Sequence, residues 1–244
     1  MKTYNLLGRD VEEMWEAKFY VALSLCEEAF FMPDIVRSRN FVNRDHRMWQ
    51  TVWTTPSICA TGRSAAGTPV VLYAHVPNFY SYAKNVKVAV EEKKLIKGAG
   101  VLPREEFARL LALEGDGVQV VDCDILNKSI NGLIKVDKAL DHPQTLPFLG
   151  VSREEARVYL KKHKQVYGPD IGIWHCDDLG EEPVARPLLI GFASKGIFDG
   201  ANNLDNGGHV LGERCRVSVD VEKEVQNISR IVSLEEVLTE RKKS

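Results

Sequence analysis

The sequence lacks the long apolar runs that mark membrane proteins and secreted precursors. No window approaches the ~18 consecutive apolar residues that a membrane-spanning helix requires. The opening segment, MKTYNLLGRD, has one lysine and no apolar signal core. We therefore expect a cytoplasmic protein with no membrane partner.

Cysteines are few, and none of their spacings matches a disulfide framework or a zinc site. The five are odd in number, widely separated and without a C-x-x-C pair (Cys26, Cys59, Cys123, Cys176 and Cys215). Most lie in apolar runs, which is typical of buried thiols in a reducing compartment. We expect five free thiols, in agreement with a cytoplasmic location.

The chain also lacks a strong net charge and any phosphate-binding glycine motif. Its 32 basic and 34 acidic residues leave a net charge of −2, so no overall field favours nucleic acid or an anionic membrane. The glycine-rich segments GRSAAG and KGAG do not have the G-x-x-x-x-G-K-[ST] spacing. Nucleic acid is therefore not expected as a partner.

What the sequence does contain is an ordinary mixture of helix and strand signals. With 244 residues and no linker-like segment, it predicts one domain spanning 1–244. Helices are predicted at 11–31, before Gly98, after Pro103, after Ser152 and at 222–240. Strands are predicted at 57–61, 68–76, 117–125, 171–179, 187–193 and 215–221. The segments 34–50 and 126–150 are predicted to be irregular. This mixture favours an α+β fold with a mainly antiparallel or mixed sheet and amphipathic helices packed on it.

The stretch 169–217 is the centre of the predicted organisation, because polar groups there follow predicted strands. His175, Asp177 and Asp178 end one strand, and His75 ends another. Polar side chains at a sheet rim can reach a ligand while the apolar strand anchors them. We expect these four residues to share catalytic acid and base roles. The alternative is that the acids cap turns and the histidines bond to the backbone.

A pair of carboxylates, Asp122 and Asp124, ends the strand at 117–125. If that end meets the histidines, the oxygens would suit a divalent cation such as Mg²⁺ or Mn²⁺. The alternative is again turn capping.

Two further segments are candidates for substrate contact. The segment 34–50 is rich in arginine, and Arg44 and Arg47 could bind a phosphate or carboxylate; the alternative is a solvated loop. The loop 199–209 is rich in asparagine and glycine, and we expect it to be mobile and to offer Asn202, Asn203 and Asp205 to a ligand.

Two hypotheses of function follow. The first is an enzyme, a hydrolase or group transferase, that acts on a small polar molecule through the Asp and His cluster. The second is a non-catalytic binding protein or an assembly subunit, including a homo-oligomer. Its interface would be the Gly/Asn loop and exposed aromatics such as Trp49, Trp53, Phe79 and Tyr80.

Overall fold

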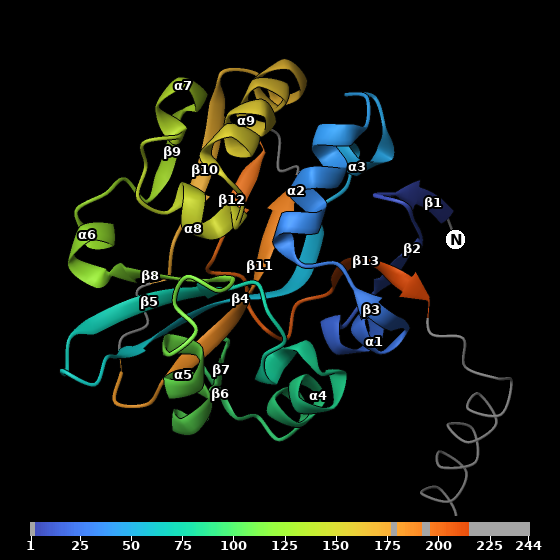
Figure 1. The fold of residues 1–244 in the computed structure, drawn as a ribbon. Helices are drawn as coiled ribbons and strands as arrows, with labels where there is room; N and C mark the ends of the chain where they lie inside the picture. Colours follow the sequence, from blue (N-terminus) through green and yellow to red (C-terminus); the bar gives the residue numbers. More distant parts are fainter. Residues whose placement is uncertain (1–2, 177–179, 192–195, 215–244) are drawn as a thin grey trace, which may run out of the picture. The chain divides into compact units, whose positions relative to one another are not determined.

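A continuous β-sheet forms the frame of the computed structural model, which describes residues 3–176, 180–191 and 196–214 (Figure 1). Its main path runs β1-β2-β13-β4-β11-β12-β10-β9, and the other strands attach at its sides. The strands are β1 (Thr3–Leu6), β2 (Arg9–Glu16), β3 (Cys26–Ala29), β4 (Trp53–Arg63), β5 (Pro69–Ala74), β6 (Leu95–Ile96), β7 (Ala99–Val101), β8 (Val118–Asp122), β9 (Gly132–Lys135), β10 (Asp170–Trp174), β11 (Val184–Gly191), β12 (Ile197–Asp199) and β13 (Gly208–Arg214).

Helices pack on this sheet from two sides. They are α1 (Phe19–Ser24), α2 (Met32–Phe41), α3 (Arg47–Gln50), the short 3-10 helix at Phe79–Ser81, α4 (Ala83–Glu91), α5 (Arg104–Leu111), α6 (Cys123–Asn127), α7 (Val136–Ala139), α8 (Thr145–Leu149) and α9 (Arg153–Tyr167). No helix among the described residues is both long enough and apolar enough to cross a membrane.

Most neighbouring strands are antiparallel, while β10 with β12 and β13 with β4 are parallel. The predicted α+β fold, with a mainly antiparallel or mixed sheet and helices packed on it, is therefore confirmed. The predicted strand at 215–221 and helices at 222–240 lie outside the described residues. A single domain over 1–244 accordingly stays a prediction.

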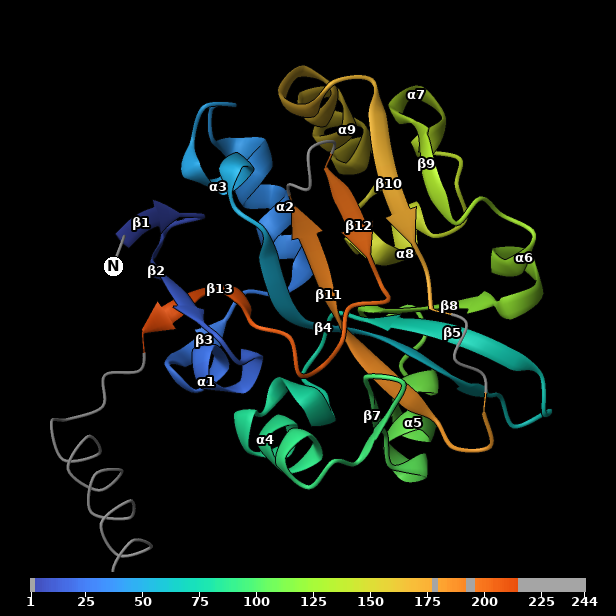
Figure 2. The same ribbon diagram turned by 180° about the vertical axis from the view of Figure 1, so that it is seen from behind.

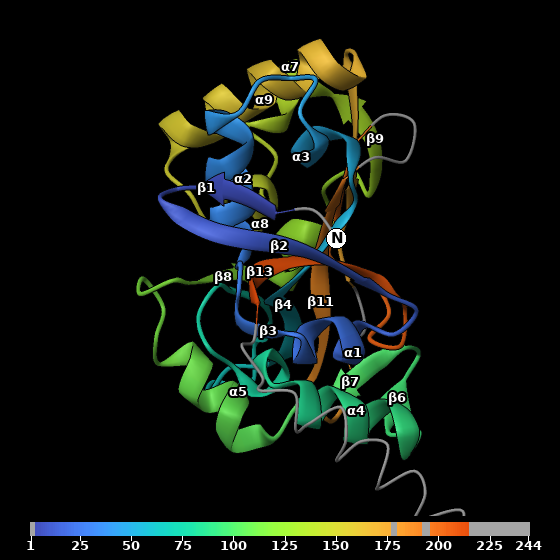
Figure 3. The same cartoon turned by 90° about the vertical axis from the view of Figure 1, so that its right-hand side faces the viewer.

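Strand β4 separates two apolar cores and is buried along nearly its whole length. Trp53 and Cys59 point into a core that also contains side chains of α2, α3, α8 and α9. Ile58 and Ala60 point the other way, into a core shared with α1, α4 and α5. The two groups of helices lie on opposite sides of β4 in Figures 1 and 3. A strand buried on both faces has no polar alternation, which explains its continuous run of small and apolar residues.

The helix predicted at 11–31 is wrong. The segment instead forms β2, α1 and β3. Leu7 and Gly8 both have positive φ, of 56° and 77°, and form a two-residue turn that pairs β2 with β1. Val11 and Met14 are both buried, but in different cores, so a strand covered on two sides mimics helical spacing. Trp15 of the same strand is 61% exposed.

The loop predicted at 34–50 is also wrong, because α2 and α3 lie there. Pro33 falls in the first turn of α2, where proline is favoured because the first helical N–H groups have no partner. The carboxylate of Asp34 accepts a hydrogen bond from the backbone N–H of Phe31 at 3.1 Å. Pro33 therefore marks the start of a helix.

Several local predictions are confirmed. The strands predicted at 57–61 and 68–76 correspond to β4 and β5, which pair as a hairpin, and the predicted helices before Gly98 and after Pro103 are α4 and α5. Helix α9 begins with a reciprocal cap: Ser152 Oγ accepts from the Glu155 N–H at 3.2 Å, and the Glu155 carboxylate accepts from the Ser152 N–H at 3.0 Å. The prediction of irregular chain at 126–150 is wrong, because β9, α7 and α8 lie there.

A buried arginine joins four of these elements. Arg39 in α2 has no solvent exposure. Its guanidinium donates at 2.9 Å to the carbonyls of Met48 and Thr51 and to the hydroxyl of Tyr159. It also lies 5.2 Å from the centre of the Trp49 ring. The two carbonyls, the hydroxyl and the ring compensate the buried charge, in place of a carboxylate. Through them Arg39 links α2 to α3, to the residues that precede β4 and to α9.

We expect Arg39→Ala to lower the free energy of unfolding by about 3–5 kcal/mol, because it leaves buried acceptors without donors. Arg39→Lys should recover only part of this loss, because one ammonium cannot reach three separated acceptors. Urea denaturation measures both changes.

The matched control is Arg37→Ala in the same helix. Arg37 has a 46% exposed side chain and an ion pair with Glu155 at 2.9 Å, so its loss should cost about 1 kcal/mol or less. Equal costs at Arg37 and Arg39 would contradict the structural role assigned to Arg39.

Candidate functional site

His75 follows β5, and both of its ring nitrogens form hydrogen bonds within the fold. Nε2 lies 2.8 Å from the carbonyl of Pro147, and Nδ1 lies 3.0 Å from Ser57 Oγ. Because a carbonyl can only accept, Nε2 carries the proton and Nδ1 accepts from the serine hydroxyl. That hydroxyl accepts in turn from the Met32 N–H at 2.8 Å. Burial lowers the pKa of His75 to about 4, so the ring is neutral near pH 7 and connects β4, α2 and α8.

The carboxylates of Asp122 and Asp124 do not meet His75. Strands β5 and β8 are antiparallel, with Val70 opposite Asp122 and Ala74 opposite Val118. Asp122 therefore lies level with the start of β5, whereas His75 follows its end, on the order of 16 Å away at ~3.3 Å per residue. Asp122 caps α6 by accepting from the Asp124 N–H at 2.7 Å. The expected convergence is wrong because antiparallel strands end at opposite edges of a sheet.

The other predicted catalytic residues follow β10. His175 is only 6% exposed, and its backbone N–H donates to Asn131 Oδ1 at 3.2 Å. Asp177 and Asp178 lie outside the described residues. Within residues 3–176, 180–191 and 196–214, no three His, Cys, Asp or Glu side chains are grouped so that they could hold a metal ion. Among these described residues, no third ligand joins Asp122 and Asp124.

Of the two arginines predicted to contact substrate, Arg47 has an acidic partner. Its Nη2 and Nε lie 2.7 and 3.1 Å from the two carboxylate oxygens of Glu13. Burial alone would raise the pKa of Glu13, but hydrogen bonds from Arg47 and Tyr4 outweigh it and lower the pKa. Arg44 is exposed beside a shallow hollow of about 500 Å³ that Lys162 also lines. The Arg47 guanidinium therefore forms an ion pair with Glu13 that holds parts of the fold together.

The Asn/Gly loop is held by its own side chains. Asn202 is 6% exposed and accepts from Asn206 Nδ2 at 2.8 Å. Asn203 Oδ1 accepts from Arg186 Nη1 at 2.6 Å. Asp205 is exposed. Asn202 and Asn203, two of the three residues predicted to contact a ligand, therefore form hydrogen bonds within the protein. Asp205 and the other exposed residues of the loop remain accessible to solvent.

A different surface lies on the outer side of β9, β10 and β12. Ile171 and Ile173 point inward to the core, so the alternate residues of β10 point outward. Figure 2 shows these strands in front, with α8 and α9 behind them. We call this surface the open face; its residues are Leu133, Lys135, Asp170, Trp174, Ile197 and Asp199.

Trp174 is the large aromatic of the open face and is 40% exposed. Its indole Nε1 lies 3.0 Å from where a Cβ on Gly172 would be, and its Cη2 lies 4.0 Å from the equivalent point on Gly132. The ring thus extends across β10 and β9, over space left by two glycines. Lys135 and Asp170 form an ion pair at 2.6 Å farther along β10, four residues before Trp174. An exposed aromatic ring flanked by charged groups is suited to ligand contact.

The alternation Ile171-Gly172-Ile173-Trp174 was the signal that sequence reasoning missed. It places tryptophan and glycine together on the face away from the core. The aromatics named instead do not form a surface: Trp49, Trp53 and Tyr80 are at most 1% exposed, and Phe79 is partly buried.

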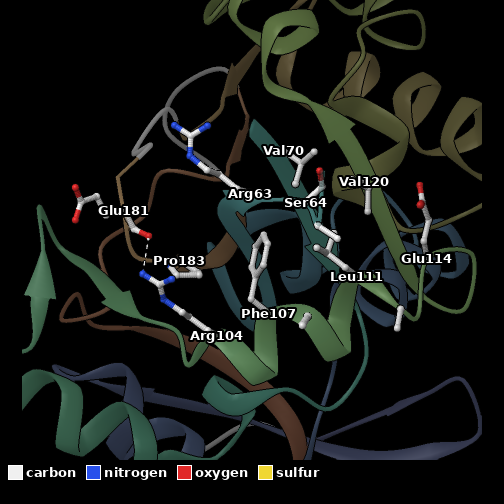
Figure 4. Close-up of a pocket in the computed structure, with 13 residues that line it drawn as sticks. Arg63, Ser64, Val70, Arg104, Phe107, Leu111, Glu114, Val120, Glu181 and Pro183 are labelled. Carbon is white, nitrogen blue, oxygen red and sulfur yellow. Dashed lines mark hydrogen bonds between the residues drawn. The ribbon is translucent and has the colours of Figure 1, made fainter. Parts of the chain in front are cut away.

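A hollow of about 580 Å³ lies between α5 and the β4–β5 turn (Figure 4). Its floor is apolar, with Phe107 and Leu111 from α5. Charges of both signs surround it, and Arg104 already pairs with Glu182 at 2.8 Å. Of the predicted functional residues that the structure describes, none lines this hollow. Its mixed charges favour no single class of ligand.

Comparison with known proteins identifies this fold. No protein-family model matches the chain, and no curated protein matches it. A solved structure from work on the accommodation of massive sequence variation in Nanoarchaeota by the C-type lectin fold is 41% identical, with a TM-score of 0.79. The match covers 84% of this chain and 97% of that one. The chain belongs to this family of C-type lectin fold proteins.

Membership of the C-type lectin fold family corrects the first hypothesis. The hypothesis of a hydrolase or group transferase is wrong, because the related protein points to binding and not to catalysis. The geometry gives the physical reason: His75 uses both ring nitrogens within the fold, and Asp122 caps a helix at the opposite end of β5. The second hypothesis, a binding protein, agrees with the family.

We expect His75 to make this lectin-fold protein sensitive to acid. Its pKa is about 4 in the folded chain against an ordinary value of 6.5. The unfolded chain therefore binds more protons between these values, so this contribution to stability is complete above about pH 6.5 and is lost as the pH falls towards 4. The loss should be roughly 3 kcal/mol by pH 4, at about 1.4 kcal/mol per pKa unit.

The measurement is the urea midpoint at several pH values for wild type and His75→Gln. Glutamine keeps a donor and an acceptor but does not titrate. His142 and His209, whose pKa values burial also lowers, remain in both proteins. Identical pH dependence in the two proteins would exclude His75 as the cause.

Proposed function

We propose that the chain is a non-catalytic binding protein whose ligand, a carbohydrate, lies on the open face with Trp174 at its centre. The observation that carries the proposal is the indole of Trp174, which is exposed and spread across two strands that have glycines beneath it. The C-type lectin fold of the related structure supports a binding role.

The chemistry of the open face favours a sugar over a purely apolar ligand. One side of a sugar ring is rich in C–H groups and can lie on an indole, while its hydroxyls need donors and acceptors at the edge. Asp199 is directly opposite Trp174 in the pairing of β12 with β10, and the Lys135–Asp170 pair lies farther along β10. Leu133 is 53% exposed and extends the apolar area beside the ring.

Trp174→Ala should abolish or strongly weaken carbohydrate binding while leaving the fold intact. Truncating a central tryptophan of a binding site commonly costs at least ~2 kcal/mol, or about a 30-fold rise in Kd. Because the ring is partly exposed, the free energy of unfolding should change by only about 1 kcal/mol. Binding of wild type and variant to an array of immobilised oligosaccharides, followed by titration with the best binder, measures the effect.

The matched control is Trp15→Ala, which removes an even more exposed tryptophan from β2, outside the open face. It should bind like wild type. Equal losses in the two variants, or undiminished binding by Trp174→Ala, would move the site away from the open face. Failure of wild type to bind any oligosaccharide would refute carbohydrate as the ligand class.

We also propose that the protein works in the cytoplasm. Cys26, Cys59, Cys123 and Cys176 are free thiols, which supports a reducing compartment. Thiol titration of denatured protein isolated without reductant from the source cells should find about five free thiols. Two or more intramolecular disulfides would contradict this location.

A further inference from the structure

The segment 82–97 has a charge that the rest of the chain does not share. It contains five lysines and two glutamates, a surplus of three positive charges in a protein of net charge −2. All five lysines are exposed; we call them the basic surface (Lys84, Lys87, Lys93, Lys94 and Lys97). They come from α4, the turn after it and the β6–β7 hairpin, which lie together in Figures 1 and 3.

Helix α4 presents one side of this surface to solvent. Val86 and Ala89 face the core, at 0% and 5% exposure. Lys84, Lys87 and Val88 follow the i, i+3, i+4 spacing and share the outward side. Lysines and an apolar side chain therefore alternate on a single exposed helical face.

Exposed apolar side chains lie among the lysines on each part of the segment. Tyr82, at the start of α4, is 60% exposed, Val88 is 38% exposed, and Ile96 in β6 is 43% exposed. The combination is amphipathic: apolar groups are surrounded by flexible cations with long apolar stems.

Acidic side chains neutralise only part of the basic surface. Lys87 lies 3.9 Å from Glu91, and Lys94 lies 2.5 Å from Glu92. The Glu91 carboxylate also accepts from the hydroxyl of Tyr20 at 2.9 Å. Among the described residues, no ion pair involves the three remaining lysines, Lys84, Lys93 and Lys97.

Two of these unpaired lysines occupy backbone positions that favour glycine. Lys93 and Lys97 have φ of 52° and 51°, in the left-handed region where a side chain is unfavourable. Lys93 follows α4, and Lys97 with Gly98 forms the two-residue turn between β6 and β7. Glycine or asparagine would serve either turn better, so the backbone does not explain lysine there. An unfavourable residue at two neighbouring turns indicates a use for the charge.

We propose that the basic surface binds the anionic surface of a lipid bilayer, with Tyr82, Val88 and Ile96 entering the headgroup region. The charges are complementary, and lysine stems can extend along the interface while apolar neighbours insert. A nucleic acid is less well matched, because the segment has no arginine for bidentate phosphate contacts. This binding is peripheral and is independent of the open face.

Co-sedimentation with vesicles tests the proposal on the full chain. Wild type should bind vesicles of phosphatidylglycerol and phosphatidylcholine in equal parts, and not phosphatidylcholine alone. Binding should weaken as salt rises, because the screening length falls to ~10 Å at 0.1 M. The triple variant Lys84→Gln/Lys93→Gln/Lys97→Gln should bind about 100-fold more weakly, at about fivefold per lysine.

A matched control removes the same charge elsewhere. Lys128, Lys138 and Lys161 are exposed and lie outside the segment, so changing all three to Gln should leave vesicle binding close to wild type. Lys93→Gly/Lys97→Gly should weaken vesicle binding without lowering the melting temperature, because glycine suits both turns. Equal losses in the two triple Gln variants, or no binding by wild type, would overturn the proposal.

A soluble polyanion separates a lipid surface from an acidic protein partner. Val88→Ser/Ile96→Ser should weaken vesicle binding and leave any weak binding to polyglutamate unchanged. Binding of wild type to polyglutamate as tight as to vesicles, and unaffected by this double variant, would identify an acidic polymer instead. Trp174→Ala should bind vesicles like wild type, so this test and the oligosaccharide test can fail separately.

Discussion

The burial of the Arg39 guanidinium is the constraint on which much of the remaining packing depends. A positive charge inside an apolar core is stable only where polar groups surround it. Here the carbonyls of Met48 and Thr51 and the Tyr159 hydroxyl have to point at one place. The Trp53 indole donates to the same Met48 carbonyl at 3.0 Å. The start of β4 is therefore positioned by the same group of atoms that fixes α3 and α9.

Once β4 is positioned, the rest of the sheet follows from its pairing. It pairs with β5, β11 and β13, and its two faces carry the two cores. Strand β10 continues the sheet through β11 and β12, and its inward residues Ile171 and Ile173 join the core beneath α8 and α9. No helix of the described residues covers its outward side in Figure 2. The open face is thus what remains when one side of the sheet is used for the core.

Local signals in the sequence predicted the elements whose stabilising contacts are local. The Ser152–Glu155 cap and the hairpin of β4 with β5 form between residues close in the chain, so their spacing is visible. Strand β2 pairs with β13, near the other end of the described chain, and no local pattern reveals such a partner. Without knowledge of that partner, the apolar residues of 11–31 suggest helical spacing, although Val11, Met14 and Trp15 face different surroundings.

The candidate site was harder to predict because strand direction decides which strand ends meet. His75 and Asp122 each follow a strand, and only the antiparallel register shows that these ends are far apart. The sequence also does not distinguish an asparagine that contacts a ligand from one that closes a loop, as Asn202 and Asn203 do. The outward position of Trp174 can be predicted from the sequence, because its alternation with Ile171 and Ile173 assigns its face without knowledge of the neighbouring strands.

The buried arginine of β11 connects the loop to the basic surface. Arg186 is 5% exposed and donates to the Lys97 carbonyl at 2.6 Å and to the side chain of Asn203. The Gly98 carbonyl accepts from the Leu204 N–H at 2.9 Å. These bonds use the backbone of the turn and not the lysine side chain, so they can compensate an unfavourable φ and leave the ammonium in solvent. The fold can therefore display a lysine where the turn itself favours glycine, and the Asn/Gly loop contributes to that geometry.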